Sequence, residues 1–271
     1  MAVKIWVTGA KGFVGARVME ALNREAGVTV VAAPSLRGMD RDGIRRLIDR
    51  TEPDAIVHTA AISDIPTCAA NPEASYRANV EIPVWIAETG VKCALFSTDQ
   101  VYGGASGEGP YAEGDEAPVN LYARHKLEME RAVLAANPDA VLLRATWMYD
   151  MPLYGVPNRP NFLTLMLSRD ALRFSGTARR AVTYVREVAA WVPMALQLPG
   201  GVYNYGSESD MTMLDTARYL SALLKLRVEL SDSGPDHNLW MNCEKIRARG
   251  IRFDTTAEGL KKCVEDYGLD R

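Results

Sequence analysis

Three glycines near the start of the chain constrain its fold more than any other feature. Gly9, Gly12 and Gly15 follow the β-rich run at residues 3–8 directly and open a segment, residues 16–24, with helical spacing of its apolar positions. Glycines at such a turn let the backbone approach a phosphate closely, and the free N–H groups at the start of the helix attract the phosphate's charge. The spacing therefore predicts a dinucleotide-binding turn between the first strand and the first helix.

Strand-like and helix-like segments alternate along the first half of the chain. The expected strands are residues 3–8, 28–33, 55–59, 94–97 and 140–143, and the expected helices include residues 44–48, 76–88 and 121–136. This alternation predicts βαβ units and a parallel sheet. Continuous apolar strands such as residues 28–33 favour a sheet that is covered on both faces. We expect an α/β, Rossmann-type doubly wound parallel sheet with a small, discontinuous C-terminal substrate lobe.

The pattern changes after residue 149, where residues 151–160 hold three prolines and one glycine and are expected to form a loop. We expect residues 1–150 to form the NAD(P)-binding core, with residues 177–206 returning to it. Residues 151–176 and 207–271 are then expected to form the substrate-binding lobe.

Composition excludes several classes of protein. The chain has 271 residues and a net charge of −3, which gives no electrostatic reason to expect a nucleic-acid partner. Apolar runs are all shorter than the roughly 18–20 residues that span a bilayer, so no membrane partner is expected. The N-terminal apolar run is too short for a secretory signal, and the scattered cysteines favour a reducing, cytoplasmic location. No metal site is expected, because cysteines and histidines do not stand at metal-ligand spacings: Cys68, Cys93, Cys243, Cys263, His58, His125 and His237.

Tyr122 and Lys126 form a Tyr-x-x-x-Lys pair on an expected helix, where positions i and i+4 share one face. A free tyrosine has a pKa near about 10, and a nearby ammonium favours the phenolate and lowers that pKa. Such a pair can exchange a proton with a carbonyl or alcohol oxygen. Thr98 ends an expected strand, and ligands of α/β sheets bind at the carboxyl ends of strands. The glycine turn, Thr98 and the pair are therefore expected at one edge.

Two histidines lie near the site in sequence, and neither is expected to act as its base. His58 is interpreted as a core or supporting residue near the cofactor. His125 lies about 100° around the helix from each member of the pair and is expected to face elsewhere.

The cofactor is expected to be NADP, with NAD left open. The residue that distinguishes the two should stand at the end of the second strand, about 20 residues past the glycines. No acid stands at residues 33–35, whereas Arg37 lies close by and Lys11 lies inside the turn. Both cations could meet a 2′-phosphate, although solvated surface cations are the alternative interpretation.

Together these residues resemble the extended short-chain dehydrogenase/reductase family. The similarity runs from Val3 to about Tyr205 and includes residues 54–61 and Asn79. Within the family, the strings at residues 53–57, 76–79, 97–99, 120–122 and 143–147 are most similar to the dTDP-4-dehydrorhamnose reductases. The resemblance implies an oxidoreductase of dTDP-rhamnose biosynthesis or a related pathway, which reduces a nucleotide-linked 4-keto sugar with NADP or NAD.

The resemblance also implies roles for single residues. Tyr122 would protonate the ketone oxygen, Lys126 would tune Tyr122 and hold the nicotinamide ribose, and Thr98 would fix the oxygen. Asp99 and Trp147 would lie against the substrate. The cofactor would contact Tyr122, Lys126 and a set drawn from the glycine turn and the following segments: Gly9, Lys11, Gly12, Phe13, Val14, Gly15, Arg37, Asp40, Ala60, Ala61, Ile62 and Asn79.

Two departures bear on the substrate. Residues 178–187 lack the Gly-Ser-Pro-Thr-like string of those reductases, and residues 237–240 match them poorly. Arg179, Arg180 and Arg186 could contact a nucleotide diphosphate, or they could form a solvated charged face.

Other functions stay open at this stage. Gln100 stands where sugar-nucleotide dehydratases of the family carry a glutamate, and an amide cannot exchange the proton, so dehydration is disfavoured. A non-catalytic, NAD(P)-binding regulatory subunit resembling the β subunit of methionine adenosyltransferase is one alternative. A sugar-nucleotide epimerase is another, and a homodimer is an open possibility for the assembly.

Overall fold

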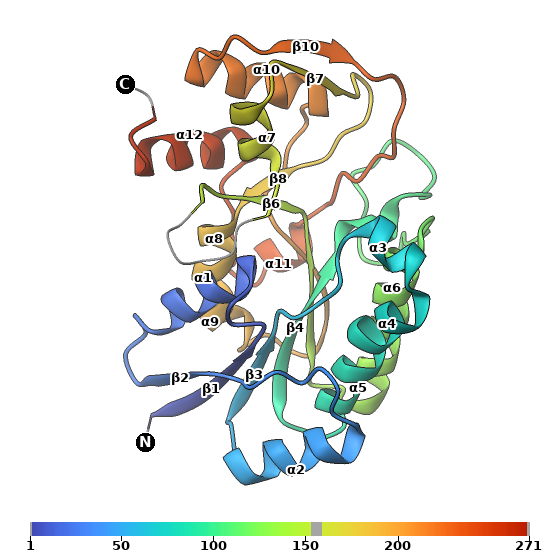
Figure 1. Ribbon diagram of the computed structural model, residues 1–271, viewed down its shortest axis with the longest axis vertical. Coiled ribbons are helices and arrows are strands. Elements are labelled where there is room, and N and C mark those ends of the chain that lie inside the picture. Colours follow the sequence, from blue (N-terminus) through green and yellow to red (C-terminus); the bar gives the residue numbers. More distant parts are fainter. Residues whose placement is uncertain (1, 153–158, 270–271) are drawn as a thin grey trace.

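The computed structural model, which describes residues 2–152 and 159–269, is built on a six-stranded parallel sheet (Figure 1). The strand order is β2-β1-β3-β4-β5-β9, and every neighbouring pair is parallel. The strands are β1 (Val3–Thr8), β2 (Val28–Ala32), β3 (Ala55–His58), β4 (Lys92–Thr98), β5 (Val141–Ala145) and β9 (Gly201–Tyr205). The predicted Rossmann-type sheet is confirmed.

Helices cover both faces of this sheet because successive strand side chains point to opposite faces. Ile5 and Val7 pack into one apolar cluster, whereas Trp6 packs into the other. The helices of the first face are α1 (Phe13–Leu22), α8 (Val185–Ala190), α9 (Val192–Ala195) and α11 (Glu244–Arg247). Those on the second side are α2 (Arg41–Thr51), α3 (Ile65–Ala70), α4 (Pro72–Tyr76), α5 (Ile82–Ala87) and α6 (Leu121–Ala136).

Helices cover both faces of the sheet, as the apolar strands predicted. β2 itself forms one edge of the sheet and is only partly buried, with Val31 36% exposed. An apolar run alone cannot distinguish a central strand from an edge strand.

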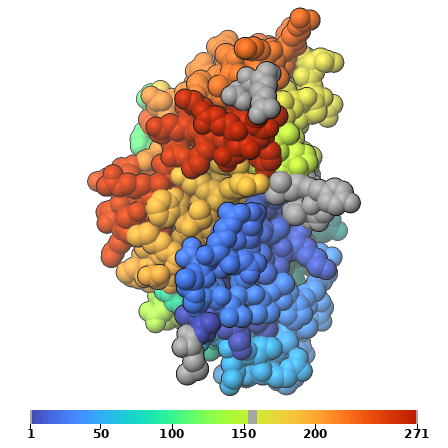
Figure 2. Space-filling view, turned by 90° about the vertical axis from the view of Figure 1, so that its left-hand side faces the viewer, coloured from blue at the N-terminus to red at the C-terminus, as the bar shows by residue number. Residues whose placement is uncertain are grey.

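Segments from the far end of the chain lie against the first helix. Figure 2 shows the N-terminal region beside the region around residues 185–200, in agreement with the packing of Val18 and Leu22 of α1 with Val188 of α8. Residues 239–251 also enter this apolar cluster. The division of the chain at residue 207 stays a prediction, and part of the chain beyond that boundary packs on the main sheet.

A second body lies beyond the carboxyl ends of β4 and β5 (Figure 1). It has its own apolar cluster and two short parallel sheets, β6 with β8 and β7 with β10. Its elements are β6 (Trp147–Tyr149), α7 (Phe162–Ser168), β7 (Ala171–Phe174), β8 (Val182–Tyr184), α10 (Met213–Leu224), β10 (Glu229–Asp232) and α12 (Thr256–Asp266). We call this body the lobe. Of the loop predicted at residues 151–160, residues 153–158 lie outside the described residues.

Within residues 2–152 and 159–269, every helix is too short or too polar to span a membrane.

Candidate functional site

A cavity of about 1500 Å³ lies where the carboxyl ends of the main strands meet the lobe. Its lining combines the glycine turn, the segments that follow β2 and β3, the end of β4, the start of α6 and lobe residues near Arg159 and Arg180. Ligands of open α/β sheets bind at this place because the loops after the strands diverge there. One cavity thus contains both the expected cofactor region and the expected catalytic region.

The glycine turn has no room for larger residues. Gly9 has a φ of +68°, and a Cβ on Gly15 would lie 2.1 Å from the carbonyl oxygen of Gly9. Gly12, the N-cap of α1, has no side chain that could cap the helix's first N–H groups. Those groups and the positive end of the helix dipole favour a phosphate. The predicted residues of the turn line the cavity: Gly9, Lys11, Gly12, Phe13, Val14 and Gly15.

Two expected cofactor residues follow β2, and only one of them lines the cavity. Arg37 lines the cavity and is exposed. Asp40 instead caps α2, where its carboxylate accepts a hydrogen bond of 2.7 Å from the N–H of Gly43, and it lies outside the lining. Asp40 is therefore not retained as a candidate cofactor residue.

Asn79 holds the loop after β3 in place from outside the cavity. Its amide accepts a 3.1 Å hydrogen bond from the N–H of Ile62 and donates one of 2.8 Å to the carbonyl oxygen of Ile62. Asn79 lies in a π-helical turn, η1 (Arg77–Glu81), between α4 and α5. The expected cofactor residues Ala60, Ala61 and Ile62 line the cavity, whereas Asn79 is buried behind them.

Thr98, at the end of β4, and Tyr122, in the first turn of α6, both line the cavity. Burial raises the pKa of Tyr122, and a hydrogen bond with Thr98 opposes this shift only in part. The expected lowering of this pKa is not found because desolvation of the phenol outweighs the other effects. Tyr122 is therefore a neutral phenol that can donate a proton.

Lys126 lies one turn further along α6 and is buried behind the lining, with 2% of its surface exposed. Burial lowers the pKa of Lys126 to about 8, while the charge of Glu130 raises it. The ammonium form therefore still dominates at neutral pH.

On the lobe side, Arg180 connects the lobe to the residue after Thr98. Its Nε donates to Oδ2 of Asp99 at 2.7 Å, and its Nη2 donates to Oδ1 at 3.1 Å. The Arg180 guanidinium also lies 5.5 Å from the centre of the Trp147 ring. Asp99, Trp147 and Arg180 thus form a polar and aromatic corner of the cavity.

Comparison with known proteins gives this arrangement a family. The family model described as the RmlD substrate binding domain matches residues 3–267. The chain belongs to this family. This result confirms the resemblance to extended short-chain dehydrogenase/reductases that the motifs indicated.

Several relatives of the chain have named functions. The dTDP-4-dehydrorhamnose reductase of Mycolicibacterium smegmatis is 37% identical over 55% of this chain and 47% of that protein, so the chain spans about half the length of that relative. The dTDP-4-keto-6-deoxy-D-glucose reductase of Streptomyces niveus is 30% identical over 80% of this chain and 77% of that protein. The methionine adenosyltransferase 2 subunit beta of Mus musculus is 28% identical over 99% of this chain and 89% of that protein.

A solved structure supports the fold. The dTDP-4-dehydrorhamnose reductase of Bacillus anthracis in complex with NADP superposes with a TM-score of 0.86 at 20% identity, over 98% of this chain and 99% of that chain.

Of the three arginines that could contact a diphosphate, only Arg180 lines the cavity. Arg179 packs over the ring of Trp240 at 4.7 Å, and Arg186 donates to the hydroxyl of Tyr267 at 3.0 Å. Arg179 precedes β8 whereas Arg186 belongs to α8, so the two side chains lie in different surroundings.

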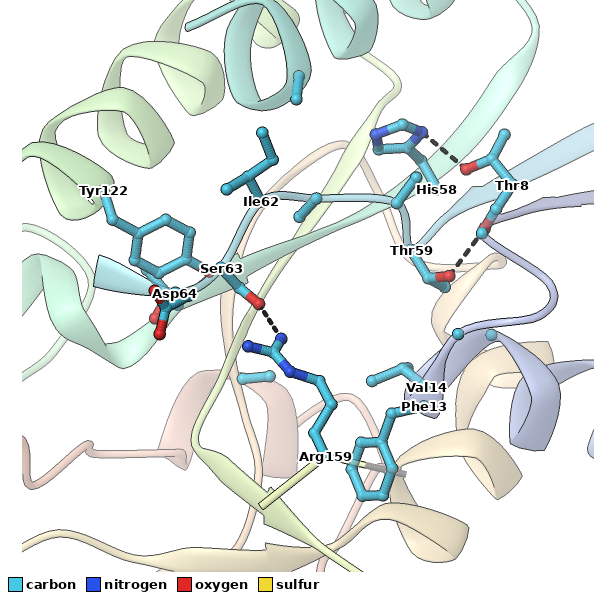
Figure 3. Close-up of a pocket in the computed structure, with 18 of the residues that line it drawn as sticks. Thr8, Phe13, Val14, His58, Thr59, Ile62, Ser63, Asp64, Tyr122 and Arg159 are labelled. Atoms are coloured by element: carbon cyan, nitrogen blue, oxygen red, sulfur yellow. Dashed lines mark hydrogen bonds between the residues drawn. The ribbon is translucent and has the colours of Figure 1, made fainter. Parts of the chain in front are cut away.

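Sequence reasoning missed Arg159. Figure 3 shows its guanidinium reaching across the cavity to the hydroxyl of Ser63, close to Tyr122 and Asp64. Arg159 stands in the proline-rich loop at residues 151–160. A basic residue in this loop is the sequence signal that could have identified Arg159 as a site residue.

The two histidines take different positions, because His58 lines the cavity and His125 does not. His58 shares a 2.8 Å hydrogen bond with the hydroxyl of Thr8, and burial lowers the pKa of His58 to about 3 (Figure 3). His58 is therefore neutral and unsuited to general acid chemistry near neutral pH. His125 faces away from the cavity, toward Ser75 and the edge of the Tyr76 ring.

Proposed function

We propose that this protein is an NADPH-dependent reductase of a nucleotide-linked 4-keto sugar, similar in activity to the dTDP-4-dehydrorhamnose reductases. The observation that supports this most is a single cavity lined both by the glycine turn and by Thr98 and Tyr122. The names of the Mycolicibacterium and Streptomyces relatives, both nucleotide-sugar reductases, support the same activity.

The turn fits a pyrophosphate because Gly12 leaves the first N–H groups of α1 without a side-chain cap and the turn lines the cavity, while a Cβ at Gly15 would lie 2.1 Å from the carbonyl oxygen of Gly9 and prevent this close turn. The turn and the start of α1 would hold the pyrophosphate, and Arg37 would hold the 2′-phosphate of NADP. Lys126 would hold the nicotinamide ribose. When bound, NADPH supplies a hydride to the carbonyl carbon of the substrate.

The chain's own residues supply the proton and the orientation. Thr98 donates a hydrogen bond to the ketone oxygen and holds it beside the phenol of Tyr122. Tyr122 transfers its proton to that oxygen as negative charge develops there. The Lys126 ammonium stabilises the phenolate that remains.

The lobe supplies the contacts to the nucleotide sugar. Trp147 packs against the sugar ring, and Asp99 and Arg180 hydrogen-bond its polar groups. Arg159 pairs with the diphosphate, because a guanidinium matches phosphate oxygens in charge and geometry. A cytoplasmic location and a homodimer stay predictions, which cell fractionation and light scattering of the purified protein test.

The decisive experiment measures NADPH oxidation by the purified protein with a panel of nucleotide-linked 4-keto sugars. We expect turnover with at least one of them and a loss of about 10²–10⁴-fold in kcat for Tyr122→Phe, the usual range for loss of a general acid. Tyr219→Phe, in α10 of the lobe, is the matched control and should leave kcat unchanged. Full turnover by Tyr122→Phe would contradict the mechanism.

The same assay distinguishes the alternatives. Tight NADPH binding without turnover of any nucleotide sugar would favour a non-catalytic subunit, in line with the similarity to the Mus musculus protein. Interconversion of 4-epimers without net consumption of NADPH would favour an epimerase.

A further inference from the structure

Lys126 carries a buried positive charge behind the cavity lining. Its ammonium is buried, and a buried charge is costly unless an opposite charge compensates it. The groups that act on Lys126 electrostatically come from α3, β3 and α6: Cys68, His58 and Glu130. His58 is neutral near pH 7, and Glu130 is the carboxylate of this set.

Glu130 is itself buried and held by hydrogen bonds from two side chains. It is 1% exposed, and its Oε1 accepts a 2.5 Å hydrogen bond from the hydroxyl of Ser97. Arg144 donates from Nε to Oε1 at 2.9 Å and from Nη2 to Oε2 at 2.6 Å. Such a two-pronged, charge-assisted contact fixes the position of the carboxylate.

These contacts connect the three elements that surround the catalytic residues. Glu130 follows Lys126 by one turn of α6, on the same face of that helix. Ser97 precedes Thr98 at the end of β4, and Arg144 lies on the neighbouring strand β5. Movement of Glu130 would therefore displace the helix of Tyr122 and Lys126 relative to the strand of Thr98.

We propose that Glu130 is a positioning residue of the site: it fixes α6 against the end of β4 and keeps Lys126 charged. Opposite charges follow one another from Lys126 to Glu130, Arg144 and Glu116, whose Oε1 lies 2.5 Å from Arg144. The inference rests on the proposed function only for its effect on turnover.

The test measures the titration of Lys126 directly, by NMR of the apoprotein with 13C-labelled lysine. The Lys126 signal is assigned by its loss in Lys126→Met. We expect Glu130→Gln to lower the Lys126 midpoint by about 1–3 pH units, the usual effect of losing a nearby opposite charge. Glu130→Asp retains the charge and should keep the midpoint within roughly half a unit of the wild type.

A matched control removes the other carboxylate of Arg144. Glu116→Gln leaves Glu130 in place and should shift the Lys126 midpoint by less than about half a unit. A folded Glu130→Gln variant with an unchanged Lys126 midpoint would overturn the proposal.

A double variant covers the case in which Glu130→Gln does not fold. Glu130→Gln with Arg144→Gln removes both charges of the pair, which the interior tolerates better than the loss of one. The same fall in the Lys126 midpoint is expected, and its absence would equally overturn the proposal.

Turnover provides the second readout. In an active enzyme, Glu130→Gln should move the high-pH decline of kcat/KM to lower pH, and Glu130→Asp should restore it. If no nucleotide sugar is turned over, the proposed function fails, while the Lys126 titration still decides the role of Glu130.

Discussion

Two arginines that line the cavity, Arg37 and Arg159, are proposed to bind phosphate groups of different ligands. Arg37 follows β2, beside the region expected for the 2′-phosphate, and Arg159 reaches toward Ser63 near Tyr122. Each would form charge-assisted hydrogen bonds, and losing such bonds typically costs about 1.5–3 kcal/mol, or roughly 10–100-fold in affinity. The two residues therefore predict separate effects on the two ligands.

We expect Arg37→Ala to raise the KM for NADPH about 10–100-fold and to leave the KM for NADH and for the nucleotide sugar within about twofold. Arg159→Ala should do the reverse, raising the KM for the nucleotide sugar and sparing that for NADPH. Steady-state kinetics with each ligand varied in turn measures both, and each variant is the control for the other. Equal effects of both variants on both ligands would contradict this division.

Glu187, at the start of α8, predicts a pH dependence of stability. Burial raises the pKa of Glu187 to about 7, against about 4.5 in the unfolded chain. Because the folded state binds this proton more tightly, the stability gained from it is present below pH 4.5 and is lost as the pH rises to 7. Above pH 7 the fold must retain a buried carboxylate.

We expect the Tm of Glu187→Gln relative to the wild type to rise by about 2–4 °C between pH 5 and pH 8, which corresponds to roughly 1 kcal/mol for a chain of this size. The modest figure allows for relaxation of the surroundings when the buried carboxylate ionises. Thermal unfolding at both pH values measures it. Glu25→Gln, on the surface, should show no such change, and a pH-independent difference for Glu187→Gln would refute the assignment.

At this scale the sequence predicted the residues that belong to short local motifs. The glycine turn, Thr98 and Tyr122 were found because their spacing along the chain reflects their geometry. Arg159 and Glu130 were not found, because their roles depend on partners such as Ser63 and Arg144 that approach only in the folded chain.

At the scale of elements, the helix predicted over residues 76–88 is present but is not uniform. Its start belongs to α4, η1 (Arg77–Glu81) forms a π-helical turn in the middle, and α5 completes it. Helical periodicity cannot reveal such a turn, since one wider turn changes the spacing only locally. The turn places the amide of Asn79 against Ile62.

Asn79→Ala should therefore loosen the loop after β3. We expect a loss of about 1–3 kcal/mol in the free energy of unfolding, since the buried N–H and carbonyl groups of Ile62 lose their partner. NADPH should bind several-fold more weakly because Ile62 lines the cavity. Urea unfolding and fluorescence titration measure the two effects.

The exposed Asn71 provides the control, and Asn71→Ala should change NADPH affinity by less than about twofold. Unchanged NADPH affinity in a destabilised Asn79→Ala variant would limit Asn79 to a structural role.

For the whole molecule, alternating strands and helices predicted the main sheet because each βαβ unit is formed by a continuous stretch of chain. The arrangement of the lobe could not be predicted from the sequence in the same way. Its short strands pair across long intervals, as β6 does with β8 and β7 with β10, and residues 239–251 leave the lobe's sequence range to pack on the main sheet. Such contacts carry no local periodicity.

A buried ion pair joins the first helix to the lobe. Nε of Arg17 in α1 lies 2.6 Å from Oδ2 of Asp150, directly after β6, and both side chains are almost completely buried. Arg17 also donates to the carbonyl oxygen of Phe13 at 2.9 Å, and Tyr267 donates to Asp150 at 2.8 Å. The pair thus links the glycine-turn helix, the lobe and the end of the chain.

Breaking this link on one side should be costly, because the partner stays buried without compensation. We expect Arg17→Met to lower the free energy of unfolding by about 3–5 kcal/mol, and the double variant Arg17→Met with Asp150→Asn to lose less than the sum of the two single variants. Arg24→Met is the control on the same helix: its exposed pair with Glu20 should contribute at most about 1 kcal/mol. Urea unfolding of the four proteins and of the wild type gives these values. Additive losses would mean that Arg17 and Asp150 stabilise the fold independently, and that the glycine-turn helix is not coupled to the lobe through them.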